Sequence, residues 1–208
     1  MTNQNKYLTT TSILSGLTLL SGAYLASPHV MAANNGAASI TVEVPSVCDL
    51  SISNSSHSVS ITPGQNLAIG TATLTTLCND GNGHSVYMVG YTGDTIGATN
   101  STKLVSTNST IATGTATSGT TSNWGVTINA VTGTYAPSIT SGWANTLKAI
   151  PASYTKIATL SGTTDQSTGS KFTAAFSAFV APSQAAGSYT GKVKFTMVHP
   201  ANATAPTT

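Results

Sequence analysis

Apolar and polar residues alternate along several stretches of the chain, which is the period-two pattern of half-buried β-strands. In residues 189–198, Val193, Phe195 and Met197 fall on one face, and the lysines and threonines between them fall on the other. Lys171 to Val180 repeats this pattern. Helical periodicity is nearly absent beyond the N-terminal segment, so the pattern predicts a domain built from strands.

The same alternation predicts further strands over residues 40–44, 47–52, 67–78, 84–91 and 123–130, with weaker ones at 154–160, 103–106 and 109–113. The phase of the pattern slips near Gly70, which predicts a β-bulge there. A dense turn signal at Asn79–Gly83 separates two of these strands. This turn predicts a β-hairpin over residues 67–91.

Many short strands with regular turns and no helices are typical of a sandwich or a barrel. The chain has 208 residues and is 39% hydrophobic, which is enough for one core. We therefore predict an all-β, Ig-like antiparallel sandwich over residues 33–199, followed by a flexible tail at 200–208. Trp124 is a candidate core tryptophan, although the Cys-Trp-Cys order of antibody domains is not present.

Residues 1–32 have the features of a secretory signal peptide. Lys6 supplies a weakly positive start, Ser12–Ala26 is apolar, and Val30-Met31-Ala32 places small residues at the positions that a signal peptidase reads. The alternative is an uncleaved membrane anchor, but the apolar stretch is short and rich in Ser, Thr and Gly. We expect an exported chain without a membrane span after cleavage, located at the cell surface or secreted.

Two cysteines follow the signal segment, Cys48 and Cys78. An even pair in an exported chain predicts one disulfide. The bond would close a loop of about 30 residues and contribute roughly 3 to 4 kcal/mol by the chain-entropy model. A metal site would need more ligands, and the four histidines show no ligand spacing. We expect neither a metal nor a cofactor.

Charged residues make up only 6% of the chain, the net charge is +2, and arginine is absent. The seven lysines are scattered along the sequence, whereas a phosphate-tracking surface needs clustered cations. Nucleic-acid binding is therefore not expected. The five acidic residues also give little support for a pair of catalytic carboxylates. They are Glu43, Asp49, Asp80, Asp94 and Asp165. No nucleophile-elbow or phosphate-loop motif occurs. We expect no enzyme activity.

Three segments together resemble bacterial fimbrial and coat domains. They are SITVEVPSVCDL at 39–50, ATLTTLC at 72–78 and AAGSYTGKVKFTMV at 185–198. Chaperone–usher pilins and the spore coat protein U-like family are similar in this arrangement, and the last segment also resembles WxL surface domains. The whole chain is similar to uncharacterised exported proteins of candidate-phylum bacteria. The resemblance implies a pilin-like sandwich at the cell surface.

Two features depart from the pilin pattern. A pilin subunit is an incomplete sandwich with a long donor segment before its first cysteine, whereas only a short alternating segment precedes Cys48 here. The strong last strand also predicts a sandwich that completes itself.

Export, the disulfide, low charge and the lack of catalytic groups favour a structural or adhesive surface protein. Its partners would be other surface proteins or glycans, and self-association is possible on this hypothesis. The alternative is a carbohydrate-binding module or lectin, since sugar sites use exposed aromatic rings with amide and hydroxyl groups. Four aromatic residues in or beside loops are the candidate ligand contacts: Tyr91, Tyr135, Trp143 and Tyr154.

Overall fold

The computed structural model describes residues 41–92, 95–96, 99–107, 109–115, 117–131, 135–164 and 167–207. The chain divides into two units, Met1–Val42 and Glu43–Thr208, and the fold described below is that of the second unit. The predicted signal peptide at 1–32 lies outside the described residues.

Twelve strands make up the described fold, and no helix occurs in it. They are β1 (Cys48–Ser53), β2 (Asn66–Cys78), β3 (His84–Thr92), β4 (Thr95–Ile96), β5 (Leu104–Val105), β6 (Thr110–Thr113), β7 (Asn123–Ala130), β8 (Ser138–Ile139), β9 (Lys148–Ala149), β10 (Thr155–Leu160), β11 (Ser170–Phe179) and β12 (Lys192–Val198). The predicted all-β class is confirmed, and most of the strands match the alternating segments of the sequence.

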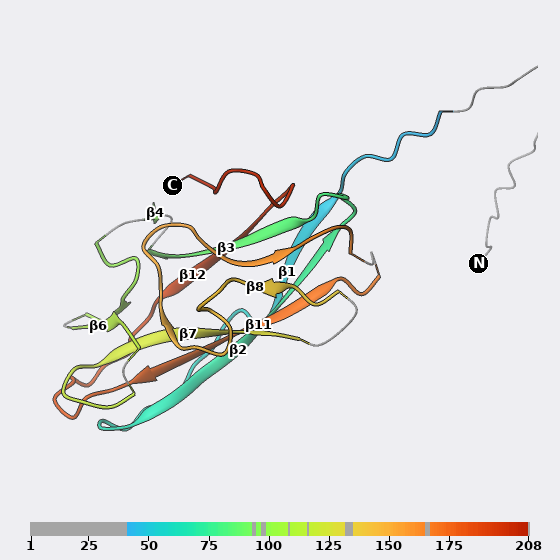
Figure 1. The fold of residues 1–208 in the computed structure, drawn as a ribbon. Helices are drawn as coiled ribbons and strands as arrows, with labels where there is room; N and C mark the ends of the chain where they lie inside the picture. The colour runs from blue at the N-terminus through green and yellow to red at the C-terminus, as the bar shows by residue number, and fades with distance from the viewer. Residues whose placement is uncertain are drawn as a thin grey trace, which may run out of the picture. The chain divides into compact units, whose positions relative to one another are not determined.

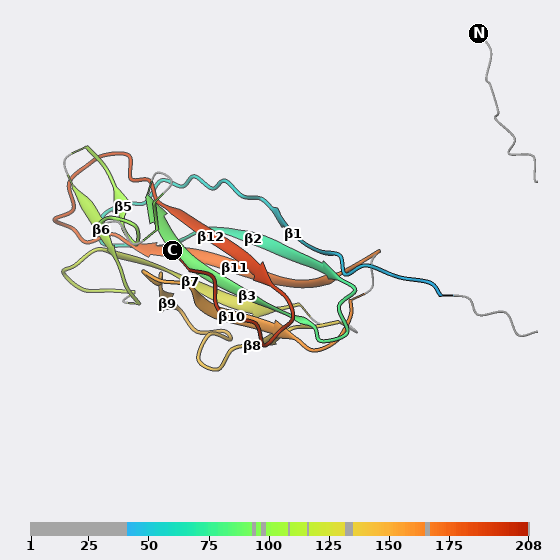
Figure 2. The same cartoon turned by 90° about the horizontal axis from the view of Figure 1, so that it is seen from above.

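The strands form two sheets that lie face to face (Figure 1, Figure 2). Sheet A has seven strands, in the order β1-β2-β11-β7-β6-β5, with β9 also paired to β7. Sheet B has five strands, in the order β12-β3-β10-β8, with β4 also paired to β3. The neighbouring strands are antiparallel except for β6 and β7. The domain is therefore sandwich-like.

The hydrophobic core lies between the inner faces of the two sheets. The largest of its fully buried apolar side chains come from strands of both sheets and include Leu74, Met88, Ile128, Ile157 and Phe172. Burying one such side chain contributes roughly 1.5 to 3 kcal/mol. From the last strand, Val193, Phe195 and Met197 pack against this core, as their alternation predicts.

The predicted bulge near Gly70 is present in β2. Phe176 of β11 pairs with Gly70, and the next residue of β11 pairs with Ala68, so Ile69 has no partner in this ladder. A side chain at Gly70 would meet the ring of His57, which packs over this position. Glycine therefore lets the segment between β1 and β2 approach the bulged strand closely.

The predicted hairpin over residues 67–91 is wrong. β2 lies between β1 and β11, so both of its edges are occupied, whereas β3 lies in the other sheet between β12 and β10. The turn at Asn79–Gly83 therefore carries the chain across from sheet A to sheet B. Its backbone bond runs from the Gly83 N–H to the Asp80 carbonyl, at 2.9 Å. A turn signal predicts a reversal of the chain, but it does not say which edge the next strand will meet.

The predicted strand over residues 40–44 is also wrong for its described part, because residues 41–47 form no strand. Val42 and Val44 have 79% and 75% of their surface exposed. Ile40 lies outside the described residues. An alternating segment becomes a strand only where a neighbouring backbone offers hydrogen bonds, and no described strand pairs with residues 41–44.

Gly83→Ala tests the crossing turn. Gly83 has a φ of +73°, and a Cβ there would meet the backbone carbonyl of Leu160. We expect this change to lower the free energy of unfolding by about 2 kcal/mol or more, measured by chemical denaturation. Gly81→Ala is the matched control, because nothing lies within 4 Å of its added carbon. That control should change stability by less than about 0.5 kcal/mol.

Candidate functional site

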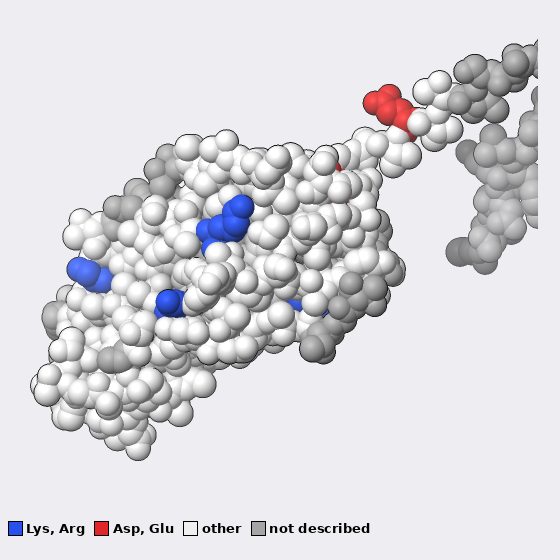
Figure 3. Space-filling model, in the orientation of Figure 1, with Lys and Arg blue, Asp and Glu red and all other residues white. Residues whose placement is uncertain are grey.

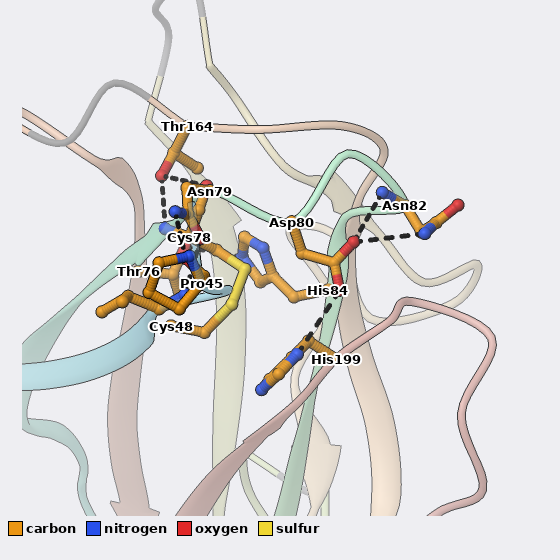
Figure 4. The surroundings of a disulfide bond; sticks show 11 residues. Pro45, Cys48, Thr76, Cys78, Asn79, Asp80, Asn82, His84, Thr164 and His199 are labelled. Carbon is orange, nitrogen blue, oxygen red and sulfur yellow. Dashed lines mark hydrogen bonds and ion pairs between the residues drawn. A yellow bond between two sulfur atoms is a disulfide. The ribbon is translucent and has the colours of Figure 1, made fainter. Parts of the chain in front are cut away.

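A disulfide joins Cys48, the first residue of β1, to Cys78, the last residue of β2 (Figure 4). The two residues are direct partners in the antiparallel register, with Cα atoms 4.1 Å apart. The predicted disulfide is therefore confirmed. A disulfide between strands is typical of proteins that fold in an oxidising compartment outside the cytoplasm.

Asn79 fixes the chain that leads into this disulfide. Its side-chain oxygen accepts a bond from the Val47 N–H at 2.6 Å, and its Nδ2 donates to the Pro45 carbonyl at 2.9 Å (Figure 4). Its backbone N–H also donates to the Val47 carbonyl at 3.1 Å. Residues 45–47 are therefore held beside the end of β2 although they belong to no strand.

Thr164 ties the loop after β10 to the same end of β2. Its hydroxyl oxygen accepts a bond from the Cys78 N–H at 2.6 Å, and its own N–H donates to the Cys78 carbonyl at 2.8 Å. These bonds satisfy the backbone groups of a buried cysteine at the point where its strand ends. The disulfide, Asn79 and Thr164 together fix the place where the chain leaves sheet A.

His84 is buried between the two sheets just beyond the crossing turn. Only 2% of its surface is exposed, and its Nε2 lies 2.8 Å from the hydroxyl of Thr76 on the opposite sheet. Thr76 in turn donates to the Ser170 carbonyl at 3.5 Å, so we assign the His84 Nε2 as the donor to Thr76. The other ring nitrogen, Nδ1, is buried without a hydrogen-bond partner.

This environment favours the neutral form of His84. Burial lowers its pKa from the ordinary value of 6.5, and the nearby His199 lowers the pKa further. The space around the ring is lined mainly by apolar side chains, including Val86, Leu160 and Phe172, and is too narrow for a water molecule. A proton added at Nδ1 would therefore have neither a partner nor solvent.

Asp80 in the turn links this end of the sandwich to the end of β12. The backbone N–H of Asn82 donates to Asp80 Oδ1 at 2.8 Å and is the main cause that lowers the pKa of this carboxyl group. Asp80 Oδ2 lies 3.4 Å from Nδ1 of His199, which directly follows β12 (Figure 4). The chain beyond His199 is also held, because the Ser85 hydroxyl donates to the Ala201 carbonyl at 2.8 Å.

The four candidate aromatic residues do not form one site. Trp143 packs in the hydrophobic core with 9% of its surface exposed, and Tyr135 is exposed in the loop before β8. Tyr91 and Tyr154 lie on the outer face of sheet B. The Lys192 Nζ is 5.5 Å from the Tyr91 ring centre, and the Thr196 hydroxyl donates to the Tyr154 hydroxyl at 3.4 Å.

Four further residues on this outer face are absent from the predicted set: Tyr87, Lys156, Lys192 and Lys194. Tyr87 of β3 is nearly buried there, and the Lys156 Nζ lies 5.6 Å from the centre of its ring. Alternation within each strand assigns these side chains to the outer face. It does not say that β10, β3 and β12 are neighbours, and the grouping depends on that order.

β1 and β12 each have one edge without a strand partner among the described residues. β1 is the last strand of its sheet and pairs only with β2, and β12 is the last strand of the other sheet and pairs only with β3. The two strands also contact each other across one side of the sandwich. The last strand therefore joins sheet B by pairing with β3. The outer edges of β1 and β12 have no strand partner among the described residues.

The described residues contain no group of three or more His, Cys, Asp or Glu side chains arranged to hold a metal ion. Two of the acidic residues, Asp94 and Asp165, lie outside the described part of the chain. A search of the described residues for a helix of the length and hydrophobicity needed to cross a bilayer finds none.

Compared with protein-family models, with curated proteins and with solved structures, the chain matches none of them.

Replacing both cysteines tests the contribution of the disulfide. We expect the Cys48→Ala, Cys78→Ala double variant to lose about 3 to 4 kcal/mol of unfolding free energy, because the open chain gains loop entropy when it unfolds. The measurement is denaturant unfolding of oxidised wild type, reduced wild type and the variant. The reduced wild type should match the variant. Equal stability of all three samples would contradict the expected role of the bond.

Acid should weaken the fold through His84. Its folded-state pKa is below the unfolded value of 6.5, so the unfolded chain binds the proton more readily. Stability from this group is complete above pH 6.5 and falls as the pH drops from 6.5 to the folded-state pKa. Unfolding curves between pH 8 and pH 5 should show this decline for wild type and for His199→Gln. In His84→Gln the decline over this interval should largely disappear, and an unchanged decline would rule His84 out as its cause.

Proposed function

We propose that this chain is a non-catalytic structural protein of the cell surface, and that its sandwich joins further copies of itself through open strand edges. The observation that carries the proposal is that, within the part of the chain that the structure describes, β1 and β12 each have one edge without a strand partner, on one side of the domain. An edge strand presents free N–H and C=O groups, which form a template for a strand from another molecule.

The segment before β1 has the composition of such an added strand. Val42 and Val44 alternate with polar residues and are among the most exposed apolar side chains of the described chain. Alternating valines would place one apolar row against a partner sheet and one polar row toward solvent. Because the segment is short, it would supply a short strand.

The disulfide and the low charge fit a protein that works outside the cytoplasm. The Cys48–Cys78 bond lies where the segment before β1 enters the sheet. A force on that segment would therefore act on a covalent crosslink and not on the β1–β2 hydrogen bonds alone. The resemblance of three segments to pilin and coat domains supports the same proposal. Signal-directed export and assembly at the surface remain parts of this proposal.

Val42→Asp with Val44→Asp tests the role of the exposed segment. We expect the purified wild-type protein to form oligomers whose mass rises with concentration in light scattering. The double variant should stay monomeric, since a charge on the apolar row opposes docking against a sheet. Both residues are highly exposed, so the fold should be unaffected.

Val131→Asp is the matched control, because Val131 is also an exposed valine but lies just after β7. It should associate like wild type. A wild-type protein that remains monomeric at every concentration, or a control that loses association to the same extent, would overturn the proposal.

A further inference from the structure

We propose that the outer face of sheet B binds an acidic polysaccharide, meaning a sugar chain with regularly spaced carboxylates. The face carries three lysines, Lys156, Lys192 and Lys194, and two partly exposed tyrosines, Tyr91 and Tyr154. Tyr87 lies under Lys156 and is nearly buried. This binding surface does not depend on the proposed self-association.

Strand register places these residues in rows across β10, β3 and β12. In one row Tyr87 pairs with Lys156 on one side and with Thr196 on the other. In a second row Tyr91 pairs with Lys192. The side chains point outward, because the residues between them on β3 and β12 pack against the core.

The three lysines share one face of the sheet. Lys192 and Lys194 are two residues apart on one strand, a spacing of about 7 Å. Lys156 is in the same row as Thr196, two strands away, which places it about 12 Å from Lys194 and about 17 Å from Lys192. The Debye length is about 8 Å at physiological salt and about 30 Å at 0.01 M salt, so the three positive potentials add at low salt. Lys192 and Lys194 are exposed, and Lys156 is half-buried.

The described strands of sheet B carry no acidic residue that could neutralise this charge, and Asp94, between β3 and β4 in the sequence, lies outside the described residues. The five strands of the sheet carry three of the chain's seven lysines and no Asp or Glu. The one ion pair found among the described residues joins His199 to Asp80, at the end of the sandwich. Among the lysine, aspartate and glutamate side chains visible in Figure 3, acidic atoms are confined to the N-terminal end of the described chain and a small spot beside it.

The chemistry of this face favours a carboxylated sugar chain over a phosphate polymer. Phosphate recognition commonly uses the two-pronged guanidinium of arginine, which this chain lacks. The lysines act as separate point charges, and the hydroxyl groups of Thr196, Tyr91 and Tyr154 between them suit the hydroxyls of a sugar. Each tyrosine that lies under a lysine also helps to hold the ammonium group in place.

Affinity electrophoresis of the full protein through gels that contain polygalacturonate, with neutral dextran as the comparison gel, tests the proposal. We expect wild type to be retarded by polygalacturonate at low salt, to lose the retardation as salt rises, and to pass freely through dextran. The Lys156→Gln, Lys192→Gln, Lys194→Gln variant should bind roughly 30-fold more weakly, about threefold for each lysine.

The control is the Lys148→Gln, Lys171→Gln variant, which loses two charges from strands of sheet A and is compared with Lys192→Gln, Lys194→Gln, which loses two from sheet B. The control should keep its affinity within about twofold, since exposed charges outside the binding face are screened. Three outcomes would overturn the proposal: no retardation of wild type, an equal loss in both variants, or tighter binding to duplex DNA or anionic lipid vesicles than to polygalacturonate.

Discussion

Leu74 of sheet A and Met88 of sheet B lie in the same apolar layer, and neither sheet can bury its inner face without the other. The burial of these two faces against each other is the interaction on which the rest of the domain depends. Each connection that leads from one sheet to the other has to keep these two apolar faces in contact. The first crossing is secured by the disulfide, by the bonds of Asn79 and Thr164 to neighbouring backbone, and by the hydrogen bond from His84 to Thr76 across the core.

The sequence was sufficient to predict most of the longer strands, the bulge at Gly70 and the disulfide, because each depends on neighbouring residues or on a residue type. The two-residue strands β4, β8 and β9 were not predicted. Strand pairing depends on which edges are free, and this explains the wrong hairpin over residues 67–91. The alternation of Val42 and Val44 is a genuine strand pattern, but the described chain provides no partner backbone for it. Trp143 lies in a stretch rich in turn residues, and only the fold shows that its ring enters the core.

The outer face of sheet B shows the same limit for the candidate site. Lys156 and Lys192 are far apart in the sequence, and the lysines therefore seemed scattered. β3 places them on one face of the sheet by pairing with β10 on one edge and with β12 on the other. In a chain with so few charges, the placement of three of them on one sheet changes the interpretation of the surface more than the net charge does.

β11 lies at the centre of sheet A, between β2 and β7, although it is the eleventh strand of the chain. Until residues 170–179 are available, β2 has only β1 beside it, and an isolated two-stranded ribbon is marginally stable. The N-terminal half therefore cannot fold on its own while the remainder is still being synthesised. Folding must close a loop of about a hundred residues between β2 and β11, which makes it slow and dependent on a strand that comes late in the sequence. Such a polypeptide remains unfolded for longer than one whose neighbouring segments pair locally.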